Sequence, residues 1–157
     1  MTSMKTPTVL SRIAAVCTVC TIGTISITSL AHAQPVVSDA WARATVPQQK
    51  ATGFFAQITY PKGGKLISAS SPVAGVVEIH EMAMEGDVMK MRAIATLDLP
   101  AGKPVALRPG GHHVMLLDLK QQLKPGERVP LKLVFEGADK KRETVEVKAV
   151  VKALATP

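Results

Sequence analysis

The chain has 157 residues and a net charge of +7, and its length is typical of one domain with one hydrophobic core. A basic balance can indicate nucleic-acid binding, but beyond residue 33 the densest basic run is Lys140-Lys141-Arg142, which is typical of a turn. We therefore expect no nucleic-acid binding, and we assign the charge to a solvated face that can steer an acidic partner.

Residues 1–33 have the pattern of a secretory signal peptide. Lys5 and Arg12 precede an apolar run that closes on Ala31-His32-Ala33, which is the order of a positive region, a hydrophobic region and an A-x-A cleavage site. The run is interrupted by Thr and Ser and is too weakly apolar for a transmembrane anchor. We expect cleavage near Ala33, which lowers the net charge from +7 to +5 and leaves residues 34–157 as a single exported domain.

Both cysteines, Cys17 and Cys20, lie within the predicted signal peptide. Val16 and Val19 precede them, whereas a small residue is expected before a lipidated cysteine. We therefore expect neither cysteine to carry a lipid, and we expect no membrane span in the mature chain. A mature domain without cysteine has no disulfide, although disulfides are common outside the cytoplasm, so its hydrophobic core must stabilise it.

The mature part of the chain alternates apolar and polar residues with a period of two. Residues 129–136 (VPLKLVFE) and 143–151 (ETVEVKAVV) show this most clearly, and the pattern is typical of half-buried strands. Turn sequences such as PKGG, EGD, RPGG and KPGE separate the segments. The other predicted strands are 37–43, 53–60, 65–70, 76–84, 88–94, 105–107 and 112–119. Regular short strands without a convincing helix predict an all-β fold of the sandwich or barrel type.

Histidine and methionine are confined to one part of the predicted mature chain. All three histidines and all five methionines lie between His80 and Met115. Methionine commonly fills gaps in hydrophobic cores, and that use would spread it along the chain. Taken singly, each of these residues is better explained by packing, but the cluster as a whole favours a metal site.

Residues 76–94 are predicted to form a hairpin that turns at Gly86. A loop at residues 86–87 places His80 diagonal to Met91, whereas a loop at 85–86 places the two directly opposite. In both registers one face of the hairpin carries the same four side chains, because cross-strand neighbours share a face. They are His80, Met82, Met89 and Met91.

A later predicted strand supplies two further candidate ligands. His113 and Met115 are two residues apart and therefore share a face, whereas His112 points to the other side while the strand stays regular. The candidate metal ligands are His80, Met91, His113 and Met115, with Met82 and Met89 nearby.

The donor set indicates which metal it would bind. Thioethers are soft and neutral and imidazole is intermediate, a combination that suits Cu(I) better than Mg²⁺, Ca²⁺ or Mn²⁺. Zinc prefers cysteine, histidine and carboxylate ligands. A blue-copper electron-transfer site needs a cysteine thiolate, which the mature chain lacks. The residues therefore predict a Cu(I) site.

The spacing of these residues resembles that of the periplasmic PCu(A)C-type copper chaperones. Ten residues separate His80 from Met91, twenty-one separate Met91 from His113, and Met115 follows in an H-x-M pattern. Several longer segments also resemble the family, so that the resemblance covers nearly the whole mature chain. They are VSDAWARATVP, ASSPVAGVVEIHEM, VMKMRAI and LRPGGHHVMLLDLKQQLKPGERVPLKLVFE.

The resemblance implies a cupredoxin-like Greek-key β-sandwich in the periplasm that binds one Cu(I) through His80, Met91, His113 and Met115. It also implies supply of copper to the binuclear copper site of cytochrome c oxidase, alongside Sco-type thiol proteins. We expect a monomer. His112 departs from the aromatic or aliphatic residue expected there, and the ending VKALATP lacks the His/Met-rich tail with which some relatives are thought to take Cu(II).

Three other functions stay open on the sequence. The same site could sequester copper for resistance, without delivery. An enzyme using His80, His112 and His113 is disfavoured, because adjacent histidines on a strand diverge and a nucleophile motif such as GxSxG is absent; we therefore expect no enzymatic activity. The chain could also be an interaction module of the sandwich type whose methionines only pack.

Overall fold

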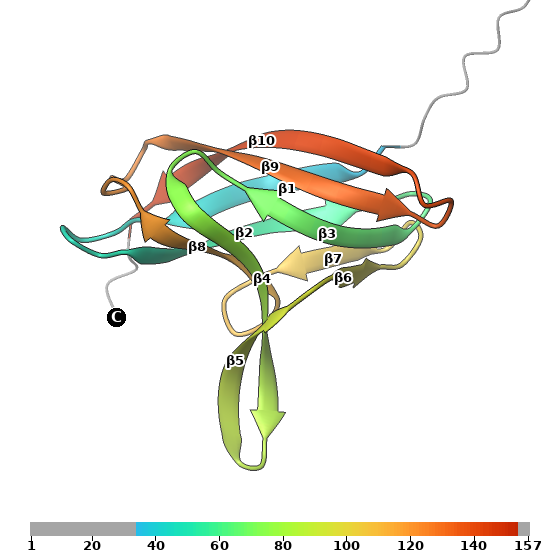
Figure 1. Ribbon diagram of the computed structural model, residues 1–157, viewed down its shortest axis with the longest axis horizontal. Coiled ribbons are helices and arrows are strands. Elements are labelled where there is room, and N and C mark those ends of the chain that lie inside the picture. Colours follow the sequence, from blue (N-terminus) through green and yellow to red (C-terminus); the bar gives the residue numbers. More distant parts are fainter. Residues whose placement is uncertain (1–33, 154–157) are drawn as a thin grey trace, which may run out of the picture. The chain divides into compact units, whose positions relative to one another are not determined.

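The computed structural model describes residues 34–153, and within that range the chain forms ten β-strands and no helix (Figure 1). The predicted signal peptide, residues 1–33, lies outside the described residues. Along 34–153 no helix is long and apolar enough to cross a membrane. The strands are β1 (Val36–Arg43), β2 (Ala51–Thr59), β3 (Gly64–Ser70), β4 (Ala74–Glu85), β5 (Val88–Ile94), β6 (Leu97–Leu99), β7 (Pro104–Leu107), β8 (His113–Leu119), β9 (Arg128–Gly137) and β10 (Arg142–Lys152).

Nine of the ten strands match the predicted segments, and the tenth, β6, was missed. β6 has only three residues, Leu97, Asp98 and Leu99, too few for an alternating pattern to stand out beside the turn that follows. Both leucines are buried, and the strand pairs with β3 at the sheet edge. One predicted strand also starts too early, because His112 precedes the first residue of β8.

The strands form one continuous hydrogen-bonded path in the order β5-β4-β8-β2-β1-β10-β9-β3-β6, with β7 paired to β2. Neighbours on this path are mostly not consecutive in sequence, and β1 pairs with β10 in parallel. One core cluster draws its fully buried side chains from both ends of the path, including Phe54 of β2, Leu66 of β3, Leu116 of β8 and Phe135 of β9. The sheet therefore folds over on itself to enclose a single core, which confirms the predicted all-β sandwich class (Figure 1).

The β4–β5 hairpin extends beyond this sandwich (Figure 1). β4 pairs with β8 only as far as His80, and from there to its end it pairs with β5 alone. Every residue of β5 before Ile94 is exposed. We call the projecting part, residues 81–92, the arm.

The register of the arm agrees with the first of the two predicted alternatives. The loop is Gly86-Asp87, and Gly86 has a φ of 64°, a conformation that glycine adopts at no steric cost in a two-residue hairpin turn. Met82 faces Met91 across the hairpin. The other register, in which His80 faces Met91 directly, is wrong, because His80 faces Ala93.

Tyr60, the only tyrosine of the chain, is buried in the core at the end of β2. Its hydroxyl donates a hydrogen bond of 3.2 Å to Glu143 Oε1, and its ring meets that of Phe135 edge-on at 6.1 Å between centroids. Burial of the phenol, and secondarily the nearby Glu143 carboxylate, raise the pKa of Tyr60 from its ordinary value of 10.0. The native state therefore holds this proton more tightly than the unfolded state does.

We predict that this proton makes the fold sensitive to alkaline pH. Because the folded pKa is raised, the stabilisation is fully present below about pH 10 and is lost as the pH rises through the folded pKa. The free energy of unfolding, measured by denaturant titration with Trp41 fluorescence, should fall less between about pH 8 and pH 11 in Tyr60→Phe than in the wild type. All other groups are the same in the wild type and in Tyr60→Phe. If the free energy of unfolding falls with the same slope against pH in both proteins, the assignment to Tyr60 is contradicted.

Candidate metal centre

Two buried histidines face each other where the arm leaves the sandwich. His80 of β4 and His113 of β8 are cross-strand partners, and their ring centroids lie 5.8 Å apart. His80 is 9% exposed and His113 is 6% exposed. Polar rings are buried to this degree only when hydrogen bonds or ligands compensate the loss of water, so the partners of their four nitrogens define what the site can do.

The His113 ring is held between a carbonyl and a thioether. Its Nδ1 lies 2.9 Å from the carbonyl oxygen of Gly111, and since a carbonyl oxygen only accepts, Nδ1 carries the proton. In the neutral ring Nε2 is then a bare acceptor, and it lies 3.1 Å from Met91 Sδ. Two lone-pair donors face each other here, an arrangement that becomes favourable when a proton or a metal cation lies between them.

The His80 ring has one nitrogen with a hydrogen-bond partner and one without. Its Nε2 lies 2.8 Å from Glu78 Oε2, and because a carboxylate accepts, Nε2 carries the proton in the neutral ring. The other nitrogen, Nδ1, is buried and has no hydrogen-bond partner. A buried nitrogen left bare costs free energy in the protein alone, which is expected of a group whose partner is a ligand. The carboxylate–histidine contact is the arrangement that commonly orients metal-binding imidazoles.

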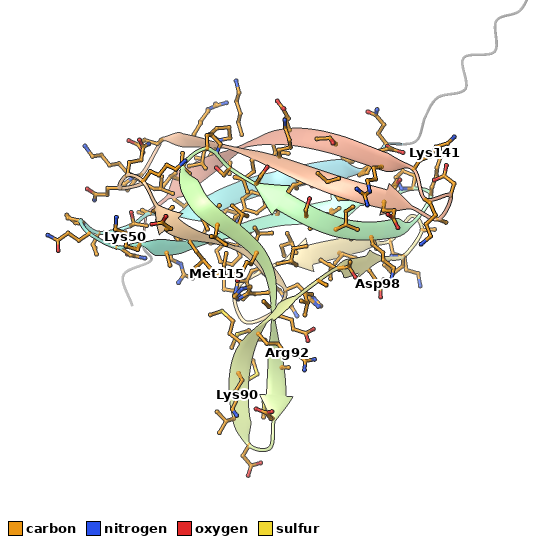
Figure 2. The ribbon with its side chains drawn as sticks, in the orientation of Figure 1. Lys50, Lys90, Arg92, Asp98, Met115 and Lys141 are labelled. Atoms are coloured by element: carbon orange, nitrogen blue, oxygen red, sulfur yellow. The ribbon has the colours of Figure 1, made fainter. Side chains whose placement is uncertain are left out.

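Met115 lies beside these groups on the same face as His113, two residues further along β8. It lines a hollow of about 310 Å³ together with Met91, His113 and Met82, and Figure 2 shows it close to the point where the arm leaves the sandwich. The hollow therefore contains three of the four predicted ligands, and Met82 as a further thioether. His80 adjoins it through His113.

The remaining methionines lie further out on the arm. Met84 and Met89 face each other across the hairpin and are 62% and 48% exposed. They share the face of Met82 and Met91 but are one cross-strand pair further from the histidines. The sequence analysis placed both Met82 and Met89 near the candidate ligands. In the structure Met82 lines the hollow, whereas Met89 lies further out on the arm.

His112 lies on the opposite side from His113. Its Nε2 is 3.5 Å from Glu81 Oε2, and Glu81 also accepts a hydrogen bond of 2.6 Å from Arg92 Nε. Because Glu81 follows His80 directly on β4, it points to the other face of the strand. His112 therefore belongs to a charged cluster behind the site, as strand alternation predicts.

An aromatic wall supports His113, and sequence reasoning missed it. Phe55 of β2 lies 6.3 Å from the His113 ring and stacks on Trp41 of β1 at 4.4 Å. Arg43 lies over the Phe55 ring at 5.8 Å, and Lys152 lies over Trp41 at 5.0 Å. The only sequence signal for this wall was the presence of aromatic residues on two predicted strands, which says nothing of what they pack against.

Gly53 gives this wall the space it needs. It is the cross-strand partner of Met115, and a Cβ at position 53 would lie 2.7 Å from the Phe55 ring. The glycine therefore lets the aromatic ring lie over the strand next to the methionine, an example of close approach that only glycine permits.

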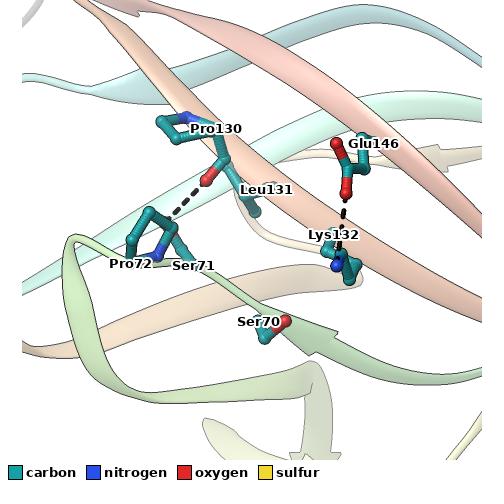
Figure 3. A pocket seen from close by; sticks show the side chains of 7 residues that line it. All are labelled: Ser70, Ser71, Pro72, Pro130, Leu131, Lys132 and Glu146. Carbon is teal, nitrogen blue, oxygen red and sulfur yellow. Dashed lines mark hydrogen bonds and ion pairs between the residues drawn. The ribbon is translucent and has the colours of Figure 1, made fainter.

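A second hollow, of about 470 Å³, lies away from the histidines between the β3–β4 turn and β9 (Figure 3). Ser71 Oγ donates to the Pro130 carbonyl at 2.7 Å, and Lys132 pairs with Glu146 at 3.2 Å. Its lining contains neither histidine nor methionine, and its two charged side chains, Lys132 and Glu146, already pair with each other. The side chains whose donors suit a soft metal line the hollow at His113 instead.

The donors at the histidine site fit a soft cation. Metal bonds of about 2.0 Å to imidazole nitrogen and 2.3 Å to sulfur, the values for zinc, place two ligands of one ion roughly 3–4 Å apart. The 3.1 Å between His113 Nε2 and Met91 Sδ falls in this range. The His80 and Met115 side chains lie on the same face of the sheet as His113, because His80 is the cross-strand partner of His113 and Met115 follows His113 by two residues. Neutral nitrogen and thioether donors together favour a soft, singly charged metal ion.

Comparisons with known proteins give the family. Residues 36–151 match the family model described as putative lipoprotein LpqE-like. The chain is 30% identical over 115 residues to the putative lipoprotein Lxx21020 of Leifsonia xyli subsp. xyli, an alignment that covers 71% of this chain and 68% of that protein.

Solved structures agree with this assignment. The apo PCuAC domain from PmoF1 is 29% identical with a TM-score of 0.64, over 77% of this chain and 95% of that domain. CuI-DR1885 from Deinococcus radiodurans is 31% identical with a TM-score of 0.57, over 78% of this chain and 83% of that protein. Fold and site thus define a β-sandwich of the PCuAC type, which confirms the predicted resemblance. The chain belongs to the LpqE-like family.

The family description refers to lipoproteins, and a lipoprotein needs a cysteine for its lipid. Cys17 and Cys20 are the only cysteines of this chain, and both lie outside the described residues. Export without a lipid anchor, with cleavage near Ala33, stays a prediction.

We predict the two tautomers from the hydrogen bonds above. Long-range ¹H–¹⁵N NMR spectra of the metal-free protein above neutral pH should show His113 protonated at Nδ1 and His80 protonated at Nε2. Glu78→Ala removes the acceptor of the His80 proton and should change the His80 pattern while leaving that of His113. A wild-type His80 protonated at Nδ1 would contradict the role given to Glu78.

Proposed function

We propose that the protein is an exported copper chaperone that binds one Cu(I) through His80, Met91, His113 and Met115. The observation that carries the proposal is the contact of 3.1 Å between the bare His113 Nε2 and Met91 Sδ, beside a buried His80 Nδ1 without a partner. The copper in CuI-DR1885, a relative of the same fold, and the export implied by the relatives' description as putative lipoproteins support it.

The charge of the donor set favours Cu(I) over divalent ions. All four proposed ligands are neutral, and the nearest carboxylate, Glu78, already accepts the His80 Nε2 proton. A divalent hard ion such as Mg²⁺ or Ca²⁺ would need several oxygen ligands. Soft thioethers and imidazole match Cu(I), and they hold it without the thiolate that an electron-transfer copper site needs.

The site has a fixed side and an open side, which suits transfer to a partner. Both histidines are buried and held by hydrogen bonds, whereas Met91 is 50% exposed. The Met91 thioether can therefore be replaced first, while the histidines still hold the ion. No proton needs to move when one neutral thioether replaces another, so copper can pass by stepwise ligand exchange and remain Cu(I).

The recipient proposed is the copper-bearing subunit of cytochrome c oxidase, with a Sco-type thiol protein as a further partner. This follows from the resemblance to the PCu(A)C chaperones, and the net positive charge of the chain is suited to an acidic recipient. We propose that the protein acts in the periplasm as a monomer, carries copper as cargo and performs no catalysis.

The first test is a Cu(I) competition titration with a chromophoric chelator under reducing conditions. The wild type should bind one Cu(I), and His113→Ala should weaken binding at least about 100-fold, since loss of even an outer-shell partner typically costs 10–100-fold. Met91→Leu, at an exposed position, keeps the fold and removes only the sulfur. His112→Ala is the matched control and should leave the affinity unchanged. If one-to-one Cu(I) binding is retained when Met91→Leu is combined with His113→Ala, the assignment of these two residues as ligands is wrong.

A second test distinguishes delivery from sequestration. The Cu(I)-loaded protein, mixed with the apo copper domain of the oxidase subunit, should lose copper to that domain, as followed by separation of the two proteins and metal analysis. Because the proposed exchange proceeds through protein–protein contact, transfer should be faster than release to buffer alone. Copper that stays on the chaperone in the presence of excess apo domain would instead indicate a sequestration protein.

A further inference from the structure

The arm presents methionine on one face and charge on the other. Across the hairpin Met82 faces Met91 and Met84 faces Met89, so that two cross-strand pairs form a ladder from the histidine site toward the tip. Three of the four are about half exposed or more, at 62% for Met84, 48% for Met89 and 50% for Met91. We call these four residues the methionine ladder.

The charged residues of the arm alternate with the ladder and point away from it. Lys90 pairs with Glu85, and Arg92 pairs with Glu81, and strand alternation places all four on the opposite face of the two strands. The ladder face therefore carries no formal charge, and its only donor atoms among the side chains are the sulfurs. So many exposed apolar side chains on one face are unusual for a surface hairpin. A row of thioether sulfurs is, however, a row of donors that can bind a soft metal ion.

The spacing of the ladder suits an ion that passes between its pairs. Cross-strand partners have Cβ atoms about 4.5–5.5 Å apart, within reach of two flexible methionine side chains that bind one ion. Successive pairs lie two residues apart along the strand, about 6.8 Å, a distance that the three rotatable bonds of each methionine can narrow. Met91 belongs to the inner pair and also contacts His113, so it connects the ladder with the buried site.

We propose that Met84 and Met89, aided by Met82, form a second and weaker Cu(I) site that serves as the entry and exit point for the ion held by the histidines. This proposal rests on the copper function proposed above. In each step one copper–sulfur bond forms at the next pair as one breaks at the last. The ion remains Cu(I), and no proton or electron is transferred. The exposed outer pair is where a partner's ligand first meets the ion.

The test replaces sulfur without changing shape. Met84→Leu combined with Met89→Leu keeps apolar volume, since leucine and methionine are interchangeable in size, and Val88→Leu on the other face is the matched control. The full mature protein, labelled at the methionine methyl groups, is titrated with one and then two equivalents of Ag(I), a diamagnetic soft ion that resists oxidation. Chelator competition with Cu(I) gives the two affinities, and stopped-flow release to excess chelator gives the exchange rate.

In the wild type, the Met91 and Met115 methyl signals should shift with the first equivalent and those of Met84 and Met89 with the second. The double variant should keep the first affinity but lose the second by at least about tenfold, the low end of losses typical for an outer-shell partner, and should release the first ion more slowly. Unmoved Met84 and Met89 signals, or a second affinity retained in the double variant, would overturn the ladder. A first equivalent that leaves the Met91 and Met115 signals unmoved would instead defeat the proposed function itself.

Discussion

The pairing of β4 with β8 is the constraint on which the site depends. It places His80 directly opposite His113, in a layer where burial removes water from both rings. The hydrogen bonds that the rings donate to the Gly111 carbonyl and the Glu78 carboxylate then determine which nitrogen of each ring remains bare. The buried His80 nitrogen without a partner costs free energy in the protein alone, and in the function proposed above a bound cation would offset that cost.

The histidines of this pair are held rigidly, whereas the methionines around them can change conformation. The histidines belong to strands of the sandwich, and the aromatic wall of Phe55 and Trp41 limits how far the His113 ring can move. The methionines lie on the arm or line the open hollow, where thioethers can change rotamer at little cost. The proposed chaperone function needs both properties, because a chaperone must hold its ion with fixed donors and release it through mobile ones.

The geometry of the arm follows from the way β4 changes partner. Its first half pairs with β8 and contributes to the core, whereas its second half pairs only with β5 and changes from half-buried to exposed toward the tip. Strand alternation continues without interruption through this change, so the face that carries His80 in the sandwich carries Met82 and Met84 on the arm. One strand thus joins a buried donor to an exposed row of sulfurs.

Sequence by itself determined the all-β class, nearly all of the strands and the residue types that a soft metal requires, because strand alternation and donor chemistry are local properties. It also narrowed the hairpin to two registers, but only the tertiary structure selected the one with His80 opposite Ala93. The short strand β6, the Gly111 and Glu78 hydrogen bonds and the wall of Phe55 likewise depend on contacts between distant segments. Such contacts leave no periodic trace in the chain, and they decide which nitrogen of each histidine is free to bind.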